Sequence, residues 1–340
     1  MTGLETHRGI LVAVVVVAAA SICAGLIRLL LPSLRRYALA RPNARSSHVE
    51  PTPQGAGVAV IAASLSVSTV AAVLGNVSVP ITVFAAVVFI GLVGFVDDVR
   101  SLPVMPRLLL QAAAVGTVLL ATPADLRIVP AFPIGIERGL ILVAGLWFIN
   151  LVNFMDGLDL MTAVEVVPIT GTMILLGLTG EFPASATIAA AALGGAMLGF
   201  VPFNRPVAKV FLGDVGSLPI GLLLGWCLLQ LAWDQQLTAA LLLPLYYLAD
   251  ATVTLLRRIA RRERFWAAHR SHFYQRAIDN GFTVSRATAE VFTLNVTLAV
   301  LAMISIYAGS ALADILTAIT GAAAVALQIY RFSRKRMPGG

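Results

Sequence analysis

The sequence predicts an all-α integral membrane protein that crosses the bilayer many times. Hydrophobic residues make up 59% of the 340 residues and charged residues only 12%, and the mean hydropathy is +0.90. A soluble domain is about 45–50% apolar and about 25% charged, so the composition excludes that class. Lipid offers backbone groups no hydrogen-bonding partners, and the apolar runs should therefore cross as helices.

Eleven apolar runs are close to the roughly 20 residues that a helix needs to cross about 30 Å of hydrocarbon. They are 10–31, 55–75, 79–96, 106–122, 138–154, 162–180, 185–203, 215–233, 236–256, 289–309 and 311–330. Short turns separate them and leave no room for a soluble domain, so we expect residues 1–340 to form one transmembrane domain.

The basic residues predict the orientation of these helices. Of the 24 Lys and Arg residues, all but Arg8, Arg127 and Arg138 follow odd-numbered runs or lie in the C-terminal tail. The positive-inside rule therefore puts the N-terminus outside and the C-terminus in the cytoplasm. The net charge of +7 is then mainly a topology signal, with lipid headgroups as partners. No soluble basic module is available for nucleic acid, which we do not expect to bind.

Most of the acids on the predicted cytoplasmic side lie in motifs rich in Gly and Asn. The motifs are "FVDDVRSLP", "NLVNFMDGLDL" and "NRPVAKVFLGDVGS". Solvated loop acids are the simple alternative, but crowded carboxylates near low dielectric neutralise one another unless a cation binds. Mg²⁺ binds through one or two carboxylates and leaves positions for phosphate oxygens. Gly157, Gly213 and Gly216 would let backbone approach closely. These motifs favour a metal-bound diphosphate at this face.

The predicted ninth loop, "RRIARRERFWAAHRSHFYQRA", supplies positive charge. Its first arginines, 257–264, are expected to bind headgroups. His269 and His272 could suggest zinc, but no third ligand is nearby. We expect Arg270 and the two histidines to hold a phosphate or a leaving group.

Taken together, the motifs resemble those of the polyprenyl-phosphate N-acetylhexosamine-1-phosphate transferases, glycosyltransferase family 4. The resemblance rests on "RPNARSSHVEPTPQGAG" (41–57), the Asp97-Asp98 pair, "NFMDGLD", "NRPVAKVFLGDVGS" and "AHRSHFYQRA", in that order. The last motif looks like the branch that initiates O-antigen synthesis. The chain departs from the family pattern at Leu160 and Ala56, where Gly is usual, and at Gln54, where Arg is usual. We expect Leu160 to make its loop stiffer, and Gln54 to leave the site without the cation that an Arg there would offer to phosphate.

The resemblance implies an enzyme of the bacterial inner membrane whose active site is on the cytoplasmic face, in loops 32–54, 97–105, 155–161, 204–214 and 257–288. Its substrates would be undecaprenyl phosphate and a UDP-N-acetylhexosamine, either GlcNAc or a 6-deoxy relative such as FucNAc or QuiNAc. UMP would be released as O-antigen or a related envelope polysaccharide is initiated. The cofactor would be Mg²⁺, with Mn²⁺ as the alternative.

The resemblance also assigns roles to individual residues. Asp156 and Asp214 would bind the metal, and Asp97 and Asp98 would lie near the lipid phosphate or deprotonate it. The catalytic set is Asp97, Asp98, Asp156 and His269, and the substrate-binding set is Asn153, Asp159, Asn204, Phe211, Arg270 and His272. Within the second set, Asp159, Asn204 and Phe211 would contact the nucleoside, while Arg270 and His272, together with His269, would contact the diphosphate and sugar. Direct attack and an aspartyl intermediate both stay open, as does the oligomeric state, a homodimer included.

A secondary transporter is the rival interpretation, with a noncatalytic scaffold behind it. Transporters place coupling carboxylates near the bilayer midplane, often in two related halves. Here the acid clusters lie at helix ends on one side, and no repeat is evident; Glu165 and Glu290 are the acids that could lie deeper, and we expect both near the interface. For the sugar, Phe265, Trp266 and Phe273 give the ninth loop an apolar surround that favours a 6-deoxy sugar, although such aromatics also serve as interfacial anchors.

Overall fold

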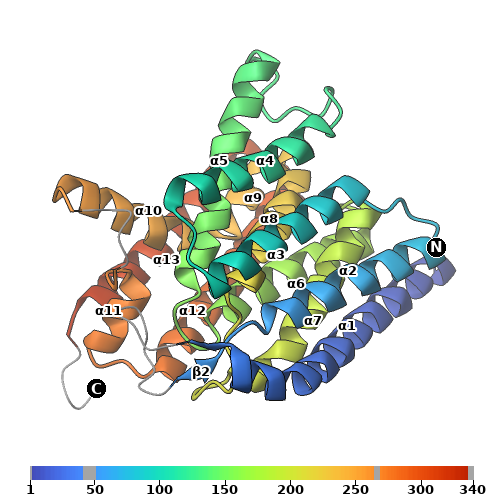
Figure 1. Cartoon of the computed structure of the whole chain (residues 1–340). Helices are drawn as coiled ribbons and strands as arrows, with labels where there is room; N and C mark the ends of the chain where they lie inside the picture. Colours follow the sequence, from blue (N-terminus) through green and yellow to red (C-terminus); the bar gives the residue numbers. More distant parts are fainter. Residues whose placement is uncertain (1, 41–50, 264–268, 336–340) are drawn as a thin grey trace.

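The structure, a computed structural model, describes residues 2–40, 51–263 and 269–335. It is an all-α bundle, which confirms the predicted fold class (Figure 1). In the described residues, nine helices are long and apolar enough to cross a membrane, and the apolar helix α4 is slightly shorter. The chain is therefore a multi-pass membrane protein. Residues 41–50 of the first family motif, and also Phe265 and Trp266, lie outside the described part of the chain.

Apart from one two-stranded pair, the regular elements are helices. They are α1 (Thr2–Tyr37), α2 (Gly57–Leu74), α3 (Ile81–Val99), α4 (Val104–Leu120), α5 (Ile134–Met155), α6 (Met161–Thr179), α7 (Ala184–Asn204), α8 (Asp214–Trp233), α9 (Leu237–Leu242), α10 (Leu245–Ala260), α11 (Phe273–Asp279), α12 (Val284–Ala308) and α13 (Ala311–Ser333). The strands β1 (Leu39–Ala40) and β2 (Thr52–Pro53) pair antiparallel.

The ninth predicted span, 236–256, is wrong as a single helix. It is divided into α9 and α10, with Pro244 at the break. Proline has no N–H to continue a helical ladder, and its ring clashes with the preceding turn. Beyond the break, α10 projects from the bundle (Figure 1). The predicted loops are also shorter than expected, because residues 32–37 belong to α1 and residues 257–260 belong to α10.

Helices α7 and α8 form the centre of the bundle. Helices α1, α2 and α6 pack on α7, while α3 and α5 pack on α8. Small residues allow the closest contacts: a Cβ atom at Gly195 would lie 2.4 Å from the Val16 carbonyl oxygen, and one at Gly199 would lie 2.3 Å from that of Ala20. Such small-residue contacts are typical of helix pairs in membranes, where burial of apolar surface from water does not drive packing.

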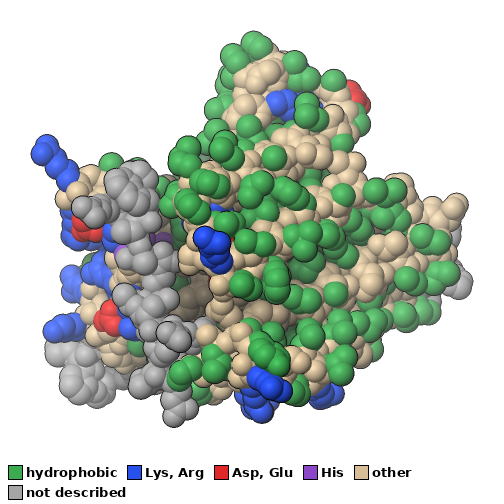
Figure 2. Space-filling view, viewed as in Figure 1, with side chains coloured by type: hydrophobic (Ala, Val, Ile, Leu, Met, Phe, Trp, Pro, Cys, Tyr) green, Lys and Arg blue, Asp and Glu red, His purple; other side chains and the backbone are tan. Residues whose placement is uncertain are grey.

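The bundle has two chemically different ends. At one end lie the β1–β2 pair, α11 and the turns that follow α3 and α5; Figure 1 shows the N-terminus far from this end. At the other end lie the turns that follow α4, α6 and α8, joined in part by the Gln235 side chain, whose Nε2 donates to the Arg127 carbonyl oxygen at 2.8 Å. Between the ends, hydrophobic side chains cover most of the visible face, and the basic side chains gather mainly towards α10, α11 and β2 (Figure 2).

Candidate active site

Asp98 joins the end of α3 to the start of α8. Its carboxylate accepts hydrogen bonds from the backbone N–H groups of Asp214 at 2.9 Å and Val215 at 3.0 Å. The first N–H groups of a helix have no partner within the helix, so a carboxylate is well suited to this position. Glycines make the contact possible: a Cβ atom at Gly94 would lie 2.2 Å from the Asp214 carbonyl oxygen, and Gly213 has φ +78°. Asp98 therefore fixes the backbone from which Asp214 projects.

Asp97, the other member of the pair, forms an ion pair with Arg107, a partner that the sequence analysis did not identify. Arg107 on α4 donates from Nη1 to its carboxylate at 2.8 Å, and the backbone N–H of Leu102 donates at 2.6 Å. The Asp97 residue is 9% exposed. The sequence held one usable signal, since Arg107 is a lone cation in the first turn of an apolar run. The predicted catalytic roles of Asp97 and Asp98 stay predictions, and both carboxylates already have hydrogen-bond donors.

Asp156 and Asp214 differ from Asp97 because neither forms an ion pair within the described residues. Asp156 follows the last residue of α5 and accepts from the Thr162 hydroxyl. Asp214 begins α8 and accepts from Nδ2 of Asn153 at 2.7 Å; the same nitrogen lies 2.9 Å from the Ser217 hydroxyl. Asn153, predicted to bind substrate, thus holds one of the two predicted metal carboxylates.

The local environment disfavours a negative charge on Asp156. Burial raises the pKa of its carboxyl to about 7, and the carboxylates of Asp214, Asp98 and Asp159 add to the rise, against the lowering effect of the Thr162 hydrogen bond. A divalent cation would reverse this preference by neutralising the cluster.

The donor set fits Mg²⁺. In the described parts of the chain, no group of three or more His, Cys, Asp or Glu side chains is arranged to hold a metal alone. Mg²⁺ does not need such a cage, because it is commonly bound by one or two carboxylates together with substrate phosphates and water. Asp156 and Asp214 are the residues that would hold it, and neither has an ion-pair partner in the part of the chain that the structure describes.

Asp159 and Asn204, two predicted nucleoside contacts, instead join two loops. The Asn204 side chain accepts from the N–H of Leu160 at 2.7 Å and donates to the Val210 carbonyl oxygen at 3.1 Å. Asp159 accepts from the N–H of Ala208 at 3.1 Å. Asn204 is 6% exposed and Asp159 is 5% exposed. Both therefore bind the α5–α6 turn to the α7–α8 turn, and contact of either with a nucleoside stays a prediction.

Phe211, the third predicted nucleoside contact, is half-buried beside the segment that follows β2. Its backbone N–H donates to the Pro53 carbonyl oxygen at 2.8 Å, and its own carbonyl oxygen accepts from Gly55 and Ala56 at 3.1 Å each. In the same segment, Nε2 of Gln54 lies 3.5 Å from the Asp98 carbonyl oxygen. The end of the first family motif thus lies directly against the site.

The backbone at Leu160 explains why a glycine is expected there. Leu160 has φ +66° and ψ −7°, the left-handed conformation that residues with a Cβ atom adopt at a cost. It immediately precedes α6, and its N–H binds Asn204. The fold retains the conformation that suits glycine although the side chain is leucine.

The predicted histidine loop lies beside the Asp156 segment. The His272 ring centroid is 4.9 Å from that of His269 and 6.4 Å from that of Phe154. The Tyr274 hydroxyl donates to the Phe154 carbonyl oxygen at 3.0 Å. A Cβ atom at Gly157 would lie only 2.1 Å from that hydroxyl, so this position requires glycine for its contact with Tyr274, and close approach of the backbone to a ligand stays a prediction. The structure therefore brings two predicted parts of the site together.

Other residues of this loop have partners inside the protein. Nδ1 of His269 lies 2.9 Å from the Ser271 hydroxyl, and Arg270 forms an ion pair with Asp279 at 3.3 Å. Phe273 is 2% exposed, and the guanidinium groups of Arg257 and Arg276 lie 5.3 and 5.6 Å from its ring centroid. The expectation that Phe273 offers apolar surface to the sugar is therefore wrong, because the ring is enclosed by the protein.

Asp250 on α10 is a site-end residue to which the sequence assigned no role. It is 0% exposed. Its carboxylate accepts from the backbone N–H groups of Phe273 and Tyr274 at 3.0 Å each, and Nδ1 of His272 lies 3.1 Å from the same carboxylate. The available signal was its position as the single acid within the apolar run "LLLPLYYLADATV". A buried acid in an apolar run requires partners, but the sequence alone does not say which.

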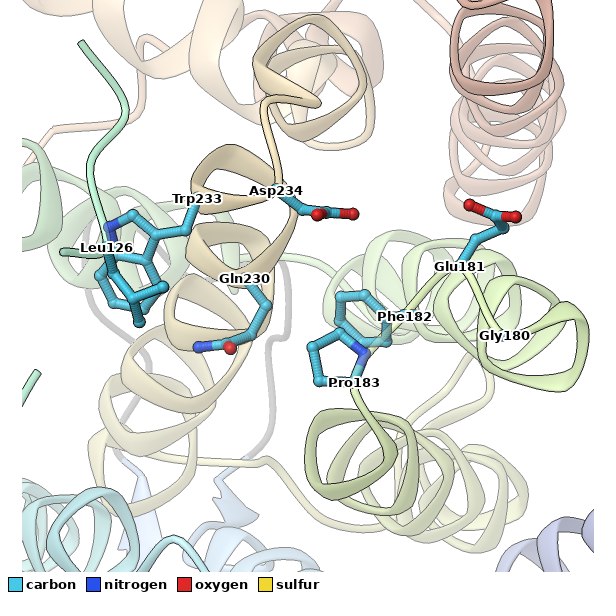
Figure 3. Close-up of a pocket in the computed structure, with 8 residues that line it drawn as sticks. All are labelled: Leu126, Gly180, Glu181, Phe182, Pro183, Gln230, Trp233 and Asp234. Carbon is cyan, nitrogen blue, oxygen red and sulfur yellow. The ribbon is translucent and has the colours of Figure 1, made fainter. Parts of the chain in front are cut away.

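A pocket of about 340 Å³ lies at the opposite end of the bundle. Its lining includes Phe182, Pro183, Gln230 and Trp233, and Figure 3 shows the carboxylates of Glu181 and Asp234 beside it. None of the predicted site residues lines this pocket. Glu165 and Glu290 both lie in the first two turns of their helices, α6 and α12, rather than mid-helix.

Comparison with known proteins identifies the family of the chain. Residues 80–232 match the family described as glycosyl transferase family 4. The chain is 31% identical over 221 residues to a phospho-N-acetylmuramoyl-pentapeptide-transferase of Streptococcus gordonii, covering 60% of this chain and 67% of that protein. It is 26% identical over 312 residues to the decaprenyl-phosphate N-acetylglucosaminephosphotransferase of Mycolicibacterium smegmatis, covering 76% and 73%. The chain therefore belongs to glycosyl transferase family 4, the family of polyprenyl-phosphate hexosamine-1-phosphate transferases.

Proposed function

We propose that the protein transfers the sugar 1-phosphate of a UDP-N-acetylhexosamine to undecaprenyl phosphate. A phosphate oxygen of the lipid attacks the β-phosphorus of the UDP-sugar, and the bond from this phosphorus to the oxygen that bridges it to the α-phosphorus breaks. UMP leaves with the electron pair of that bond, and undecaprenyl-diphospho-sugar is formed. The reaction would initiate an O-antigen or a related cell-envelope polysaccharide.

One observation carries the proposal: Asp156 and Asp214 come from different helices to the same end of the bundle and have no ion-pair partner among the described residues. A bound cation would stabilise the ionised form of these carboxylates. Carboxylate oxygens are ligands that Mg²⁺ prefers, with Mn²⁺ as the alternative. Mg²⁺, when bound, neutralises the diphosphate and stabilises the charge of the transition state.

The surrounding residues have separate tasks in this proposal. Asn153 orients Asp214 through its amide hydrogen bond, and Asp98 fixes the backbone N–H groups of the same turn. Asp97 lies beside Arg107, where a lipid phosphate could find a cation. Each of these carboxylates accepts two hydrogen bonds and has about two acceptor sites left, so Asp97 or Asp98 could take a proton without losing either bond. His269, Arg270 and His272 would contact the diphosphate and sugar.

The proposal requires the carboxylate end to face the cytoplasm, where the UDP-sugar is made, and the distribution of Lys and Arg supports this orientation. An impermeant thiol reagent tests it in intact spheroplasts. Cysteine at position 130, in the exposed α4–α5 loop, should be labelled; cysteine at position 101, next to the carboxylate cluster, should be labelled only after lysis. Labelling of position 101 in intact spheroplasts would reverse the orientation.

UMP release tests the reaction. Purified protein in detergent with undecaprenyl phosphate, UDP-GlcNAc and Mg²⁺ should release UMP and form one lipid-linked sugar per UMP. Omission of either the lipid or the metal should abolish release. A transporter or a scaffold would release no UMP from any of the UDP-sugars, and that result would reject the proposal.

The sugar is a separate question. We propose that UDP-GlcNAc or a 6-deoxy relative such as UDP-FucNAc or UDP-QuiNAc is the donor. A site that hydrogen-bonds the C6 hydroxyl rejects a deoxy sugar strongly, whereas an apolar pocket hardly rejects the hydroxyl. The enclosure of Phe273 removes one of the three aromatics that favoured a deoxy sugar. A kcat/KM for UDP-GlcNAc more than about a hundredfold above both deoxy sugars would exclude the 6-deoxy preference.

A further inference from the structure

We propose that Asp250 is a positioning residue that sets the tautomer and orientation of His272 for phosphoryl transfer. This inference rests on the proposed function, because His272 is there assigned to the diphosphate. Asp250 touches no predicted substrate group itself. It lies on α10, 22 residues before His272, and would act through the imidazole.

The carboxylate of Asp250 is completely enclosed by donors. Five groups from two segments approach it: the hydroxyls of Tyr246 and Thr254 at 3.2 and 3.3 Å, Nδ1 of His272 at 3.1 Å, and the N–H groups of Phe273 and Tyr274 at 3.0 Å each. A carboxylate with this many donors is held in one geometry, and the residue is 0% exposed. Asp250 is therefore a rigid acceptor.

The contact with His272 has a chemical consequence. An ionised carboxylate only accepts hydrogen bonds, so Nδ1 of His272 must carry a proton. Nε2 is then the ring nitrogen left for other partners. The centroid of the His272 ring is 4.9 Å from that of His269 and 6.4 Å from that of Phe154. Phe154 is two residues before the predicted metal ligand Asp156.

The same carboxylate also holds the backbone at the start of α11, directly after His272. By binding the N–H groups of the two residues after His272, Asp250 holds the backbone that carries the imidazole. The Tyr274 hydroxyl then ties this backbone to the Phe154 carbonyl oxygen. Side chain and main chain of His272 are thus set by one acid, the arrangement in which a carboxylate orients a histidine for acid–base or electrostatic work.

A double-mutant cycle separates positioning from a general structural role. Asp250→Asn keeps the size of the side chain but brings an amide N–H₂ that can oppose the Nδ1 proton. We expect kcat for UMP release to fall roughly 10²- to 10⁴-fold, with KM changing much less. In a His272→Gln background, Asp250→Asn should lower kcat only slightly further, because Asp250 acts by positioning the imidazole that this background lacks. Tyr246→Phe and Thr254→Val each remove one donor from Asp250 without touching His272, and both should stay within a few-fold of wild type.

The tautomer can be measured in the wild-type protein, whether or not the Asp250 variant folds. The chain has four histidines, so ¹⁵N imidazole spectra of the histidine-labelled protein, compared with His272→Gln, assign the His272 signals. We expect a protonated Nδ1. An unprotonated Nδ1, an Asp250→Asn variant with wild-type kcat, or equal losses in the presence and absence of His272 would each overturn the inference. Absence of UMP release by the wild type would instead reject the proposed function.

Discussion

The two ends of the bundle each hold buried or half-buried carboxylates, but they neutralise them differently. At the end away from the site, Glu137 is 3% exposed and accepts from Nε of Arg127 and from the N–H of Ile128, both at 2.6 Å. At the site end, Asp156 accepts from the Thr162 hydroxyl and Asp214 from the Asn153 amide, and neither forms an ion pair within the described residues. Charge in a low-dielectric environment needs a partner. We infer that Glu137 is structural because Arg127 supplies its cation, and that a metal ion completes the set at Asp156 and Asp214.

The pocket at the far end strengthens this contrast. Glu181 and Asp234 border it, and both residues are exposed. Water can solvate these two carboxylates, so they need no cation. An acid pair by itself therefore does not distinguish a site in this protein. The feature that sets Asp156 apart is burial without an ion-pair partner among the described residues, next to the carboxylates of Asp214, Asp98 and Asp159.

The largest effect should come from removing a site-end charge. Asp156→Asn or Asp214→Asn should lower UMP release about 10²- to 10³-fold, because the metal loses a ligand and the transition state loses electrostatic stabilisation. The variants should still fold, because each substitution removes one of several carboxylates that repel one another and breaks no ion pair of the described residues. Near-normal turnover of either variant at saturating Mg²⁺ would remove that residue from the metal site.

The matching change at the other end should act on stability and spare activity. Glu137→Gln leaves the half-buried Arg127 without its carboxylate partner, and the free energy of unfolding should fall by about 2 kcal/mol, less than for a fully buried pair because water reaches part of the guanidinium group. Thermal unfolding in detergent measures this loss, while UMP release per folded molecule at low temperature should equal that of wild type. A loss of specific activity comparable to that of Asp156→Asn would contradict the division between the two ends.

A smaller, pH-dependent effect follows from the pKa of Asp156, which burial and neighbouring carboxylates raise to about 7. In the absence of metal, its ionisation opposes folding as pH rises from about 4 to about 7. Mg²⁺ binds the ionised carboxylate and displaces a proton below pH 7. Its Kd should therefore be about tenfold higher at pH 6 than at pH 8, by calorimetry. Asp156→Asn should reduce this difference, because the variant has no proton to lose at position 156 when the metal binds; an equal Kd for the wild type at both pH values would argue against Asp156 as a ligand.

Sequence reasoning found most of the helices and the candidate residues but not their contacts. The length of an apolar run predicts a membrane span because the thickness of the hydrocarbon core sets the length that a crossing helix needs. Pro244 was a local signal for the break between α9 and α10, but the high hydropathy of residues 236–256 led to the prediction of a single helix. The pairing of Asp97 with Arg107 and of Asp250 with His272 depends on how helices pack. Residues 10 and 22 apart have no fixed spatial relation when a turn lies between them, so periodicity could not have supplied either pair.

The smallest expected effect concerns backbone strain at the site end. Non-glycine residues with positive φ also occur at Asn76 and Gln235, in turns away from the site, but there the side chains are polar. Leu160 is the unusual case, with φ +66° beside Asp159. Both Leu160→Gly and Leu160→Ala delete the side chain, and only the glycine relieves the left-handed backbone, so the glycine variant should be more stable by about 1 kcal/mol. At Leu175, within α6 and 49% exposed, the order should reverse, because alanine favours a helix over glycine by about 1 kcal/mol. Chemical denaturation in mixed micelles measures both differences. If the alanine variant is also the more stable one at position 160, the left-handed conformation is not strained there. The hydrogen bond from the Leu160 N–H to Asn204 would then not be needed to offset a backbone strain.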